Sequence, residues 1–307
     1  MKRLFTFGCS YTRYYWPTWA DLLSIEFEHS ENWGYTGIGN QAIAERLAEC
    51  DARNRFTKDD VVIIQWTSYL RHDWYHTHDL PNGRDPKWKT FGGIFSRYNK
   101  EVFDDKWIEM FFHEPAYVMH TLNYIKLTQK MLDSIGCTWY MTGMGDIRNL
   151  GRDLTNRGVY GEAITGAPAK TNEDDVFPIW KENPDFQFYE QSIWNDHPDK
   201  WLTPLYTFLE TMPNNAWWFK DENGRPWRES HLSTKVHALW VEKELGNKLS
   251  LSKSTISEIA NIISGVEDLK NQNDQMFDLC EKLGPNKENV KFNHSENFDW
   301  PPEYRGF

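Results

Sequence analysis

The chain has 307 residues, a formal net charge of −11 and a mean hydropathy of −0.72. This length accommodates one large α/β domain with an appendage, or two small domains. The acidic balance argues against a general DNA or RNA binder, because phosphate contacts need clustered Lys and Arg. It also argues against adsorption to an anionic membrane, so neither nucleic acid nor a membrane is expected as a partner.

The four cysteines and the N-terminal segment bear on the compartment. Cys9, Cys50, Cys137 and Cys280 form no CxxC pair, so neither a disulfide framework nor a zinc ribbon is indicated. The apolar run after Lys2-Arg3 is too short for a signal peptide. We therefore expect a protein made and kept in a reducing cytoplasm, which includes a viral protein made in a host cell.

Apolar runs and helical spacings alternate along most of the chain. Strands are predicted at 4–7, 32–33, 61–66, 137–141 and 216–219, and helices at 17–28, 40–49, 115–135, 201–212 and 231–245. This order predicts an α/β domain over 1–247, built as a three-layer, doubly wound, parallel five-stranded sheet. The irregular stretches 71–115 and 145–200 are expected to be inserted loops of the lid or binding type.

The C-terminal part changes character. Apolar residues from 256 to 283 recur at spacings of three and four, with Asn273 at a core position, which predicts an amphipathic or coiled-coil helix over 252–284 as a C-terminal helical extension. Two alternatives stay open: a homo-oligomer formed through 256–283, or a helix packed on its own domain. Residues 285–307 are expected to form an extended tail.

Two short segments suggest nucleophilic chemistry. Ser10 follows the first strand, at the sheet edge where ligands bind in open α/β folds, and a helix starting there would add the positive end of its dipole. Far downstream, Glu229 stands two residues before His231. Histidine can take a serine proton at neutral pH, and a carboxylate can hold its other ring nitrogen.

These segments resemble, in the same order, the conserved blocks of the SGNH or GDSL hydrolases. Gly8 to Thr12 resembles the first block in a Gly-Cys-Ser-aromatic-Thr variant often seen in phage-encoded members. Asn32 to Asn40 resembles the second block, and Glu229 to Ser233 with His237 resembles the last. The resemblance implies a flavodoxin-like fold, a Ser10–His231–Glu229 triad and oxyanion donation from the backbone amides of Ser10 and Gly37.

The third block departs from this pattern. The family's Gly-x-Asn-Asp should follow the strand ending at Trp66, but the chain continues Thr67-Ser68, without the Asn side chain that donates to the oxyanion. Losing one such donor costs about 2.7–4 kcal/mol of barrier. Thr67 or Ser68 is the candidate replacement. Asn40 and Arg71 are the candidate substrate-binding residues.

The remaining candidates concern metals and aromatic rings. His72, His76 and His78 could bind a divalent metal, but the neighbouring Trp and Tyr favour an aromatic loop, so we expect neither metal nor cofactor. Aromatic residues make up 16% of the chain. They serve either to pack irregular loops or to provide a platform for a sugar.

Two functions therefore remain open. The first is a serine esterase that hydrolyses or transfers a small acyl group, with an acylated carbohydrate as a candidate small-molecule or glycan ester substrate. The second is a catalytically weak binding or assembly protein that keeps the fold and oligomerises through its C-terminal helix.

Overall fold

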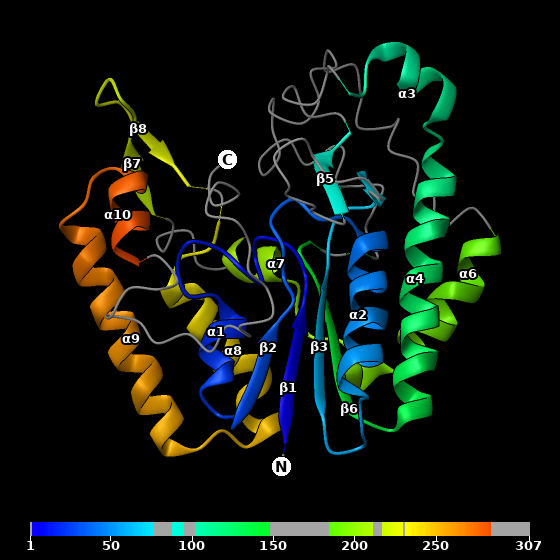
Figure 1. Ribbon diagram of the computed structural model, residues 1–307, viewed down its shortest axis with the longest axis horizontal. Coiled ribbons are helices and arrows are strands. Elements are labelled where there is room, and N and C mark those ends of the chain that lie inside the picture. The colour runs from blue at the N-terminus through cyan, green and yellow to red at the C-terminus, as the bar shows by residue number, and fades with distance from the viewer. Residues whose placement is uncertain are drawn as a thin grey trace. The chain divides into compact units, whose positions relative to one another are not determined.

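A computed structural model describes residues 2–75, 88–94, 102–145, 147, 184–210, 217–229 and 231–283 (Figure 1). The chain divides into two compact units. Unit 1 consists of residues 1–36, 59–63 and 205–307, and unit 2 of residues 37–58 and 64–204. The predicted tail 285–307 lies outside the described residues.

A four-stranded parallel sheet in the order β2-β1-β3-β6 is the main sheet of the described chain. Its strands are β1 (Arg3–Phe7), β2 (His29–Asn32), β3 (Val61–Trp66) and β6 (Thr138–Gly143). All six residues of β3 are buried, as its unbroken run of β-branched and aromatic side chains predicts for a strand covered on both faces. The mixed α/β class predicted from the alternation of elements is thus confirmed.

The predicted fifth strand at 216–219 does not join this sheet. In the described part of that stretch, β7 (Trp218–Lys220) instead pairs antiparallel with β8 (Pro226–Arg228) as a separate hairpin. Phe219 is buried while Trp218 is 57% exposed, which is the alternation of a ribbon covered on one face only. An apolar run alone could not distinguish this half-covered hairpin from a central strand.

Helices complete unit 1. They are α1 (Trp19–Ser24), α7 (Leu205–Glu210), α8 (Thr234–Leu249), α9 (Lys253–Asn271) and α10 (Met276–Leu283). Helices α1 and α8 pack together through the buried rings of Trp19 and Trp240, whose centroids are 5.6 Å apart.

The predicted helix over 252–284 is divided into α9 and α10, which lie side by side in Figure 1. Asn273 interrupts it, donating from Nδ2 to the Leu269 carbonyl at 2.5 Å and accepting from Lys282 Nζ at 2.7 Å. Val266 of α9 and Leu279 and Leu283 of α10 join a buried cluster within unit 1 that also contains Trp16, Trp217 and Phe219. Of the two alternatives left open for this segment, packing on its own unit is observed. Association with a second chain stays a prediction.

Unit 2 combines two long helices with a second hairpin. The two long helices are α2 (Asn40–Asn54) and α4 (Glu114–Ile135), which pack on each other. Unit 2 also contains the shorter helices α3 (Asp105–Phe111) and α6 (Pro184–Glu190). The hairpin is formed by β4 (Arg71–Tyr75) and β5 (Trp88–Gly93). A π-helical turn over Gln191–Asn195 and a 3₁₀ turn over Pro198–Lys200 complete the described elements. The stretches 71–115 and 145–200, expected to be loops, therefore contain regular elements where they are described.

Candidate functional site

Ser10 lies in a tight turn just after β1. The carbonyl of Cys9 accepts from the backbone N–H of Thr12 at 2.8 Å and of Arg13 at 3.1 Å, which closes the turn around Ser10. Gly8 allows this abrupt exit from the strand with a φ of 155°. Helix α1 starts only at Trp19, so the expected helix dipole at Ser10 is absent from this turn.

A buried network of polar side chains holds the turn that follows β1 in place. Asn32 Nδ2 donates to the Thr12 carbonyl at 2.8 Å and to Asp21 Oδ1 at 3.1 Å. Thr18 Oγ1 donates to the same carbonyl and lies 2.9 Å from Asp21 Oδ2. Every member has a partner, and a satisfied buried network rigidifies the backbone it holds. Our sequence analysis missed this network, although Thr18 and Asp21 have the spacing of a capping box.

The second catalytic candidate segment connects β8 to α8. The Glu229 N–H donates to the Trp217 carbonyl at 3.0 Å, and the Trp16 indole N–H donates to the Leu232 carbonyl at 2.8 Å. Ser233 then caps α8 by accepting from the Val236 N–H. The segment is therefore tied at both ends, to the β7–β8 hairpin and to the loop that follows Ser10.

Ser10, His231 and Glu229 form one hydrogen-bonded chain within unit 1. His231 Nε2 lies 2.9 Å from Ser10 Oγ, and His231 Nδ1 lies 2.7 Å from Glu229 Oε1. The same carboxylate oxygen accepts from the His231 backbone N–H at 2.9 Å. An ionised carboxylate only accepts, so Nδ1 carries the proton and Nε2 is left to accept from the Ser10 hydroxyl. This arrangement can transfer a proton from serine to imidazole.

Two tyrosines border the imidazole of His231. The Tyr14 ring stacks on it with a centroid distance of 3.8 Å and an interplanar angle of 19°, and the Tyr11 ring is 5.2 Å away. Burial, reinforced by the nearby Glu229 carboxylate, raises the pKa of Tyr14, which keeps its phenol neutral. Tyr14 therefore offers His231 a neutral aromatic face. No sequence signal points to this contact, because Tyr14 lies outside the blocks that resemble the SGNH family.

Burial also controls two further titratable groups in unit 1. His237 is fully buried in α8, and desolvation together with the charge of His231 lowers its pKa to about 3. Burial and the Glu229 carboxylate raise the pKa of the Cys280 thiol to about 12. Both groups therefore stay neutral near pH 7.

The predicted oxyanion and substrate residues outside Ser10 belong to unit 2. Gly37 has a φ of 80°, a left-handed conformation that glycine adopts without strain. Asn40 pairs with the Thr67 backbone: its Oδ1 accepts from the Thr67 N–H at 2.8 Å and its Nδ2 donates to the Thr67 carbonyl at 2.9 Å. The Thr67 hydroxyl contacts the Met144 sulfur at 4.0 Å, and the Ser68 hydroxyl accepts from the Leu70 N–H at 3.2 Å. Both hydroxyls proposed to replace the missing Asn are thus engaged within the protein.

Arg71 and His72, on β4, are likewise engaged. Arg71 donates to the Ile38 carbonyl at 3.0 Å, and His72 Nδ1 lies 2.9 Å from the Tyr117 hydroxyl. His76 and His78 fall outside the described residues. Within the described ranges, no group of three or more His, Cys, Asp or Glu side chains is arranged to hold a metal ion. No described helix is both long enough and apolar enough to cross a membrane.

Comparisons with known proteins found similar solved structures but no matching sequence family. No family model and no curated protein matches the chain. A solved structure of a member of the lipolytic protein G-D-S-L family from Veillonella parvula DSM 2008 aligns with 81% of this chain and 98% of its own, at 12% identity and a TM-score of 0.39. At this level neither a shared fold nor a shared activity follows, so function must be argued from the geometry of the chain itself.

Proposed function

We propose that this chain is a serine hydrolase of carboxylic esters, with Ser10 as nucleophile, His231 as general base and acid, and Glu229 as the group that orients His231. The supporting observation is the continuous hydrogen-bonded chain from Ser10 Oγ through His231 to Glu229 Oε1, with contacts of 2.9 and 2.7 Å. These distances lie within the reach required of an activated nucleophile and its base. The order of the three residues along the chain agrees with the SGNH resemblance.

The reaction would proceed in two halves. Ser10 Oγ attacks the ester carbonyl carbon while its proton moves to His231 Nε2, and the carbonyl π electrons move to the oxygen. As the intermediate collapses, the bond to the leaving alkoxy oxygen breaks and His231 returns the proton to that oxygen, which gives an alcohol and an acyl-serine. Water then attacks the acyl group with the same proton transfers, which releases the acid and restores Ser10. Attack by an alcohol instead of water would transfer the acyl group.

Glu229 contributes by charge as well as by orientation. During attack the imidazole becomes an imidazolium, and the buried carboxylate faces its Nδ1 at 2.7 Å. The Tyr14 ring on the imidazole face limits the rotation of His231. No metal or organic cofactor takes part in these steps.

Within unit 1 the oxyanion donor of this proposal is the backbone amide of Ser10, and donation from the Gly37 amide stays an expectation from the SGNH resemblance. The Thr67 hydroxyl contacts the Met144 sulfur, whereas the Ser68 hydroxyl accepts from the Leu70 N–H and can still donate its own proton. A site limited to backbone donors is expected to react about 10²–10³-fold more slowly than one with an additional side-chain donor.

The proposed substrate is a small acyl ester on a carbohydrate. Its test is acetate release from acetylated xylan, O-acetylated chitin oligosaccharides and peracetylated glucose, measured by a coupled acetate assay. The wild type should release acetate from at least one of them, and Ser10→Ala should not. Equal release by both proteins would exclude Ser10 as nucleophile, since background turnover by other groups would account for the signal.

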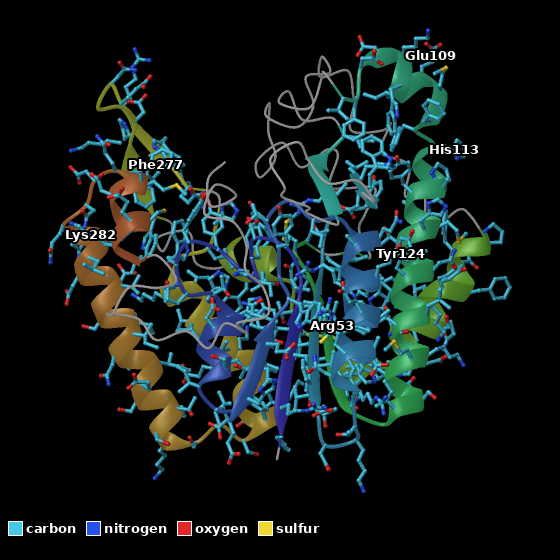
Figure 2. The ribbon with its side chains drawn as sticks, viewed as in Figure 1. Arg53, Glu109, His113, Tyr124, Phe277 and Lys282 are labelled. Carbon is cyan, nitrogen blue, oxygen red and sulfur yellow. The ribbon has the colours of Figure 1, made fainter. Side chains whose placement is uncertain are left out.

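A second candidate is a binding or assembly protein with weak catalysis. It is favoured by Thr67, whose backbone N–H donates to Asn40 Oδ1 and whose hydroxyl contacts the Met144 sulfur, so that this residue does not replace the missing Asn. In that case the protein would form a homo-oligomer through 256–283. The side chain of Phe277 on α10 is 78% exposed and available for such a contact (Figure 2). A monomer mass in light scattering, for both wild type and Phe277→Asp, would exclude this oligomer.

A further inference from the structure

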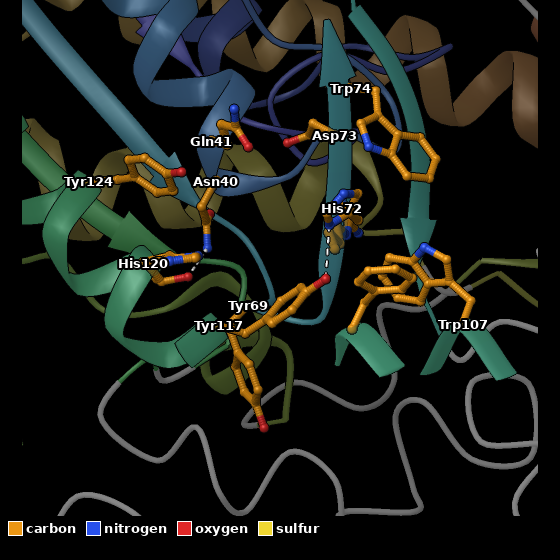
Figure 3. A pocket seen from close by; sticks show the side chains of 13 residues that line it. Asn40, Gln41, Tyr69, His72, Asp73, Trp74, Trp107, Tyr117, His120 and Tyr124 are labelled. Atoms are coloured by element: carbon orange, nitrogen blue, oxygen red, sulfur yellow. Dashed lines mark hydrogen bonds between the residues drawn. The ribbon is translucent and has the colours of Figure 1, made fainter. Parts of the chain in front are cut away.

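A hollow of about 430 Å³ opens within unit 2 (Figure 3). Strand β4, the start of α2, and helices α3 and α4 supply its lining. Its volume lies in the range of roughly 300–1,000 Å³ typical of sites for small molecules. Because every lining residue belongs to unit 2, its shape is defined within that unit alone.

Aromatic rings form one wall of the hollow. Trp74 and Trp107 are both half-buried and both meet the His72 ring edge-to-face, with centroid distances of 4.8 and 5.5 Å. Behind them the buried Phe103 stacks on Trp74 at 5.5 Å and meets Trp107 at 4.7 Å. The two indoles are therefore held in place by packing, while part of each remains open to the hollow.

The lining contains charges of both signs, since the Asp73 carboxylate lies in the field of the Arg71 guanidinium. Buried Asp73 accepts from the backbone N–H of Gly39 at 2.8 Å and of Ala42 at 3.1 Å, and burial raises its pKa to about 6. Arg71 donates to the Ile38 carbonyl. Burial lowers the pKa of His72, which keeps it an uncharged partner of Tyr117. The opposite charges of Arg71 and Asp73 offset each other, so the lining offers an ionic ligand no net charge of opposite sign.

Polar side chains complete the opposite side. Gln41 and Tyr124 line it together with His120, whose side chain is exposed on α4 (Figure 3). Their amide, phenol and imidazole groups can each donate and accept hydrogen bonds. A lining with rigid aromatic faces on one side and neutral hydrogen-bonding groups on the other suits a ligand that is apolar on one face and rich in hydroxyls at its edges.

We propose that this hollow is a binding site for a neutral carbohydrate, with a sugar ring stacked on Trp107 or Trp74 and its hydroxyls bonded to His120, Gln41 and Tyr124. The proposal concerns binding alone and stands whether or not Ser10 hydrolyses esters. It assigns the aromatic wall of unit 2 a ligand in addition to its packing role.

The test uses full-length protein carrying Ser10→Ala, which prevents turnover. Maltotetraose, cellotetraose, xylotetraose and chitotetraose are titrated in turn by isothermal calorimetry. Adenosine is titrated in the same way, as an alternative ligand with a planar aromatic ring. At least one sugar should bind, and Trp107→Ala should weaken it about tenfold, the loss expected for one aromatic contact worth about 1.4 kcal/mol. Trp218→Ala, which removes an exposed indole from unit 1, is the matched control and should leave the affinity unchanged.

A second variant tests the site independently, in case Trp107→Ala fails to fold. His120→Ala alters an exposed side chain and should weaken the same sugar about fivefold through the loss of one hydrogen bond. Failure of all four sugars to bind at up to about 10 mM would overturn the proposal, as would adenosine binding in their place. An affinity unchanged by both Trp107→Ala and His120→Ala would place the sugar elsewhere and overturn it equally.

Discussion

Neutralising the carboxylate of Glu229 should slow the attack of Ser10 by about 10³-fold. Glu229→Gln preserves the shape and an acceptor oxygen for His231 Nδ1 but removes the negative charge opposite the imidazolium that forms during attack. The Nδ1–Oε1 distance is 2.7 Å, which places the centres of the two delocalised charges about 4 Å apart. At an effective dielectric constant of about 20 this interaction is worth about 4 kcal/mol, or about three powers of ten in rate.

The assay is the second-order rate of phosphonylation by a fluorophosphonate probe, which requires the same proton transfer to His231 and needs no knowledge of the natural substrate. Glu222→Gln is the matched control, because Glu222 is an exposed carboxylate of the same unit, in the β7–β8 turn. It should leave the rate unchanged. A loss below about threefold in Glu229→Gln would refute the role assigned to the carboxylate, since it would leave less than about 0.7 kcal/mol to the charge.

Three further predictions concern the surroundings of the site. Tyr14→Leu should lower the phosphonylation rate about tenfold while Tyr14→Phe retains it, because the contact with His231 is made by the ring; equal losses would instead implicate the hydroxyl. His237 has a folded-state pKa of about 3 against an ordinary 6.5, so between these pH values only the unfolded chain binds its proton. The free energy of unfolding should therefore fall by up to about 1.4 kcal/mol per pH unit below pH 6.5, and His237→Leu should flatten this slope in urea unfolding at pH 7.0 and 5.5; identical slopes would contradict the burial of His237. The Cys280 thiol, with its pKa raised to about 12, should resist iodoacetamide at pH 8 in the native protein and react in urea, whereas rapid native labelling would show that α10 does not pack as described.

The elements predicted most closely from the sequence are those whose residues face a single environment. Strand β3 matches the predicted 61–66, since a continuous β-branched run suits only a fully covered strand. Helix α4 matches 115–135 within a residue, because Gly136 ends it in a left-handed conformation. The run at 216–219 was misassigned to the central sheet, because an apolar sequence does not reveal which strand it will pair with.

The candidate site was only partly predictable. Ser10, Glu229 and His231 are recognisable from residue types and order, and the structure brings all three within hydrogen-bonding distance. The contacts that hold them depend on long-range packing, such as the Tyr14 ring on His231 or Asn32 beneath the Ser10 turn. No local pattern encodes those contacts.

The aromatic composition of the chain indicated a possible sugar platform, but the sequence did not predict that it would lie in the hollow of unit 2. A high aromatic content is consistent with either loop packing or a sugar platform. In the described residues Trp74 and Trp107 pack on Phe103 and also line the hollow. Phe103 is fully packed, whereas Trp107 is only half-buried. Such a division depends on the three-dimensional arrangement of β4, α3 and α4, which the sequence spacing did not predict.

The most direct test of the proposed function is the identification of the residue that fluorophosphonate modifies. After labelling, digestion and mass spectrometry, we expect a single phosphonyl adduct on Ser10 in the wild type, no adduct in Ser10→Ala, and much slower adduct formation in His231→Ala. An adduct on another residue, or undiminished labelling of Ser10→Ala, would contradict the assignment of Ser10 as the nucleophile.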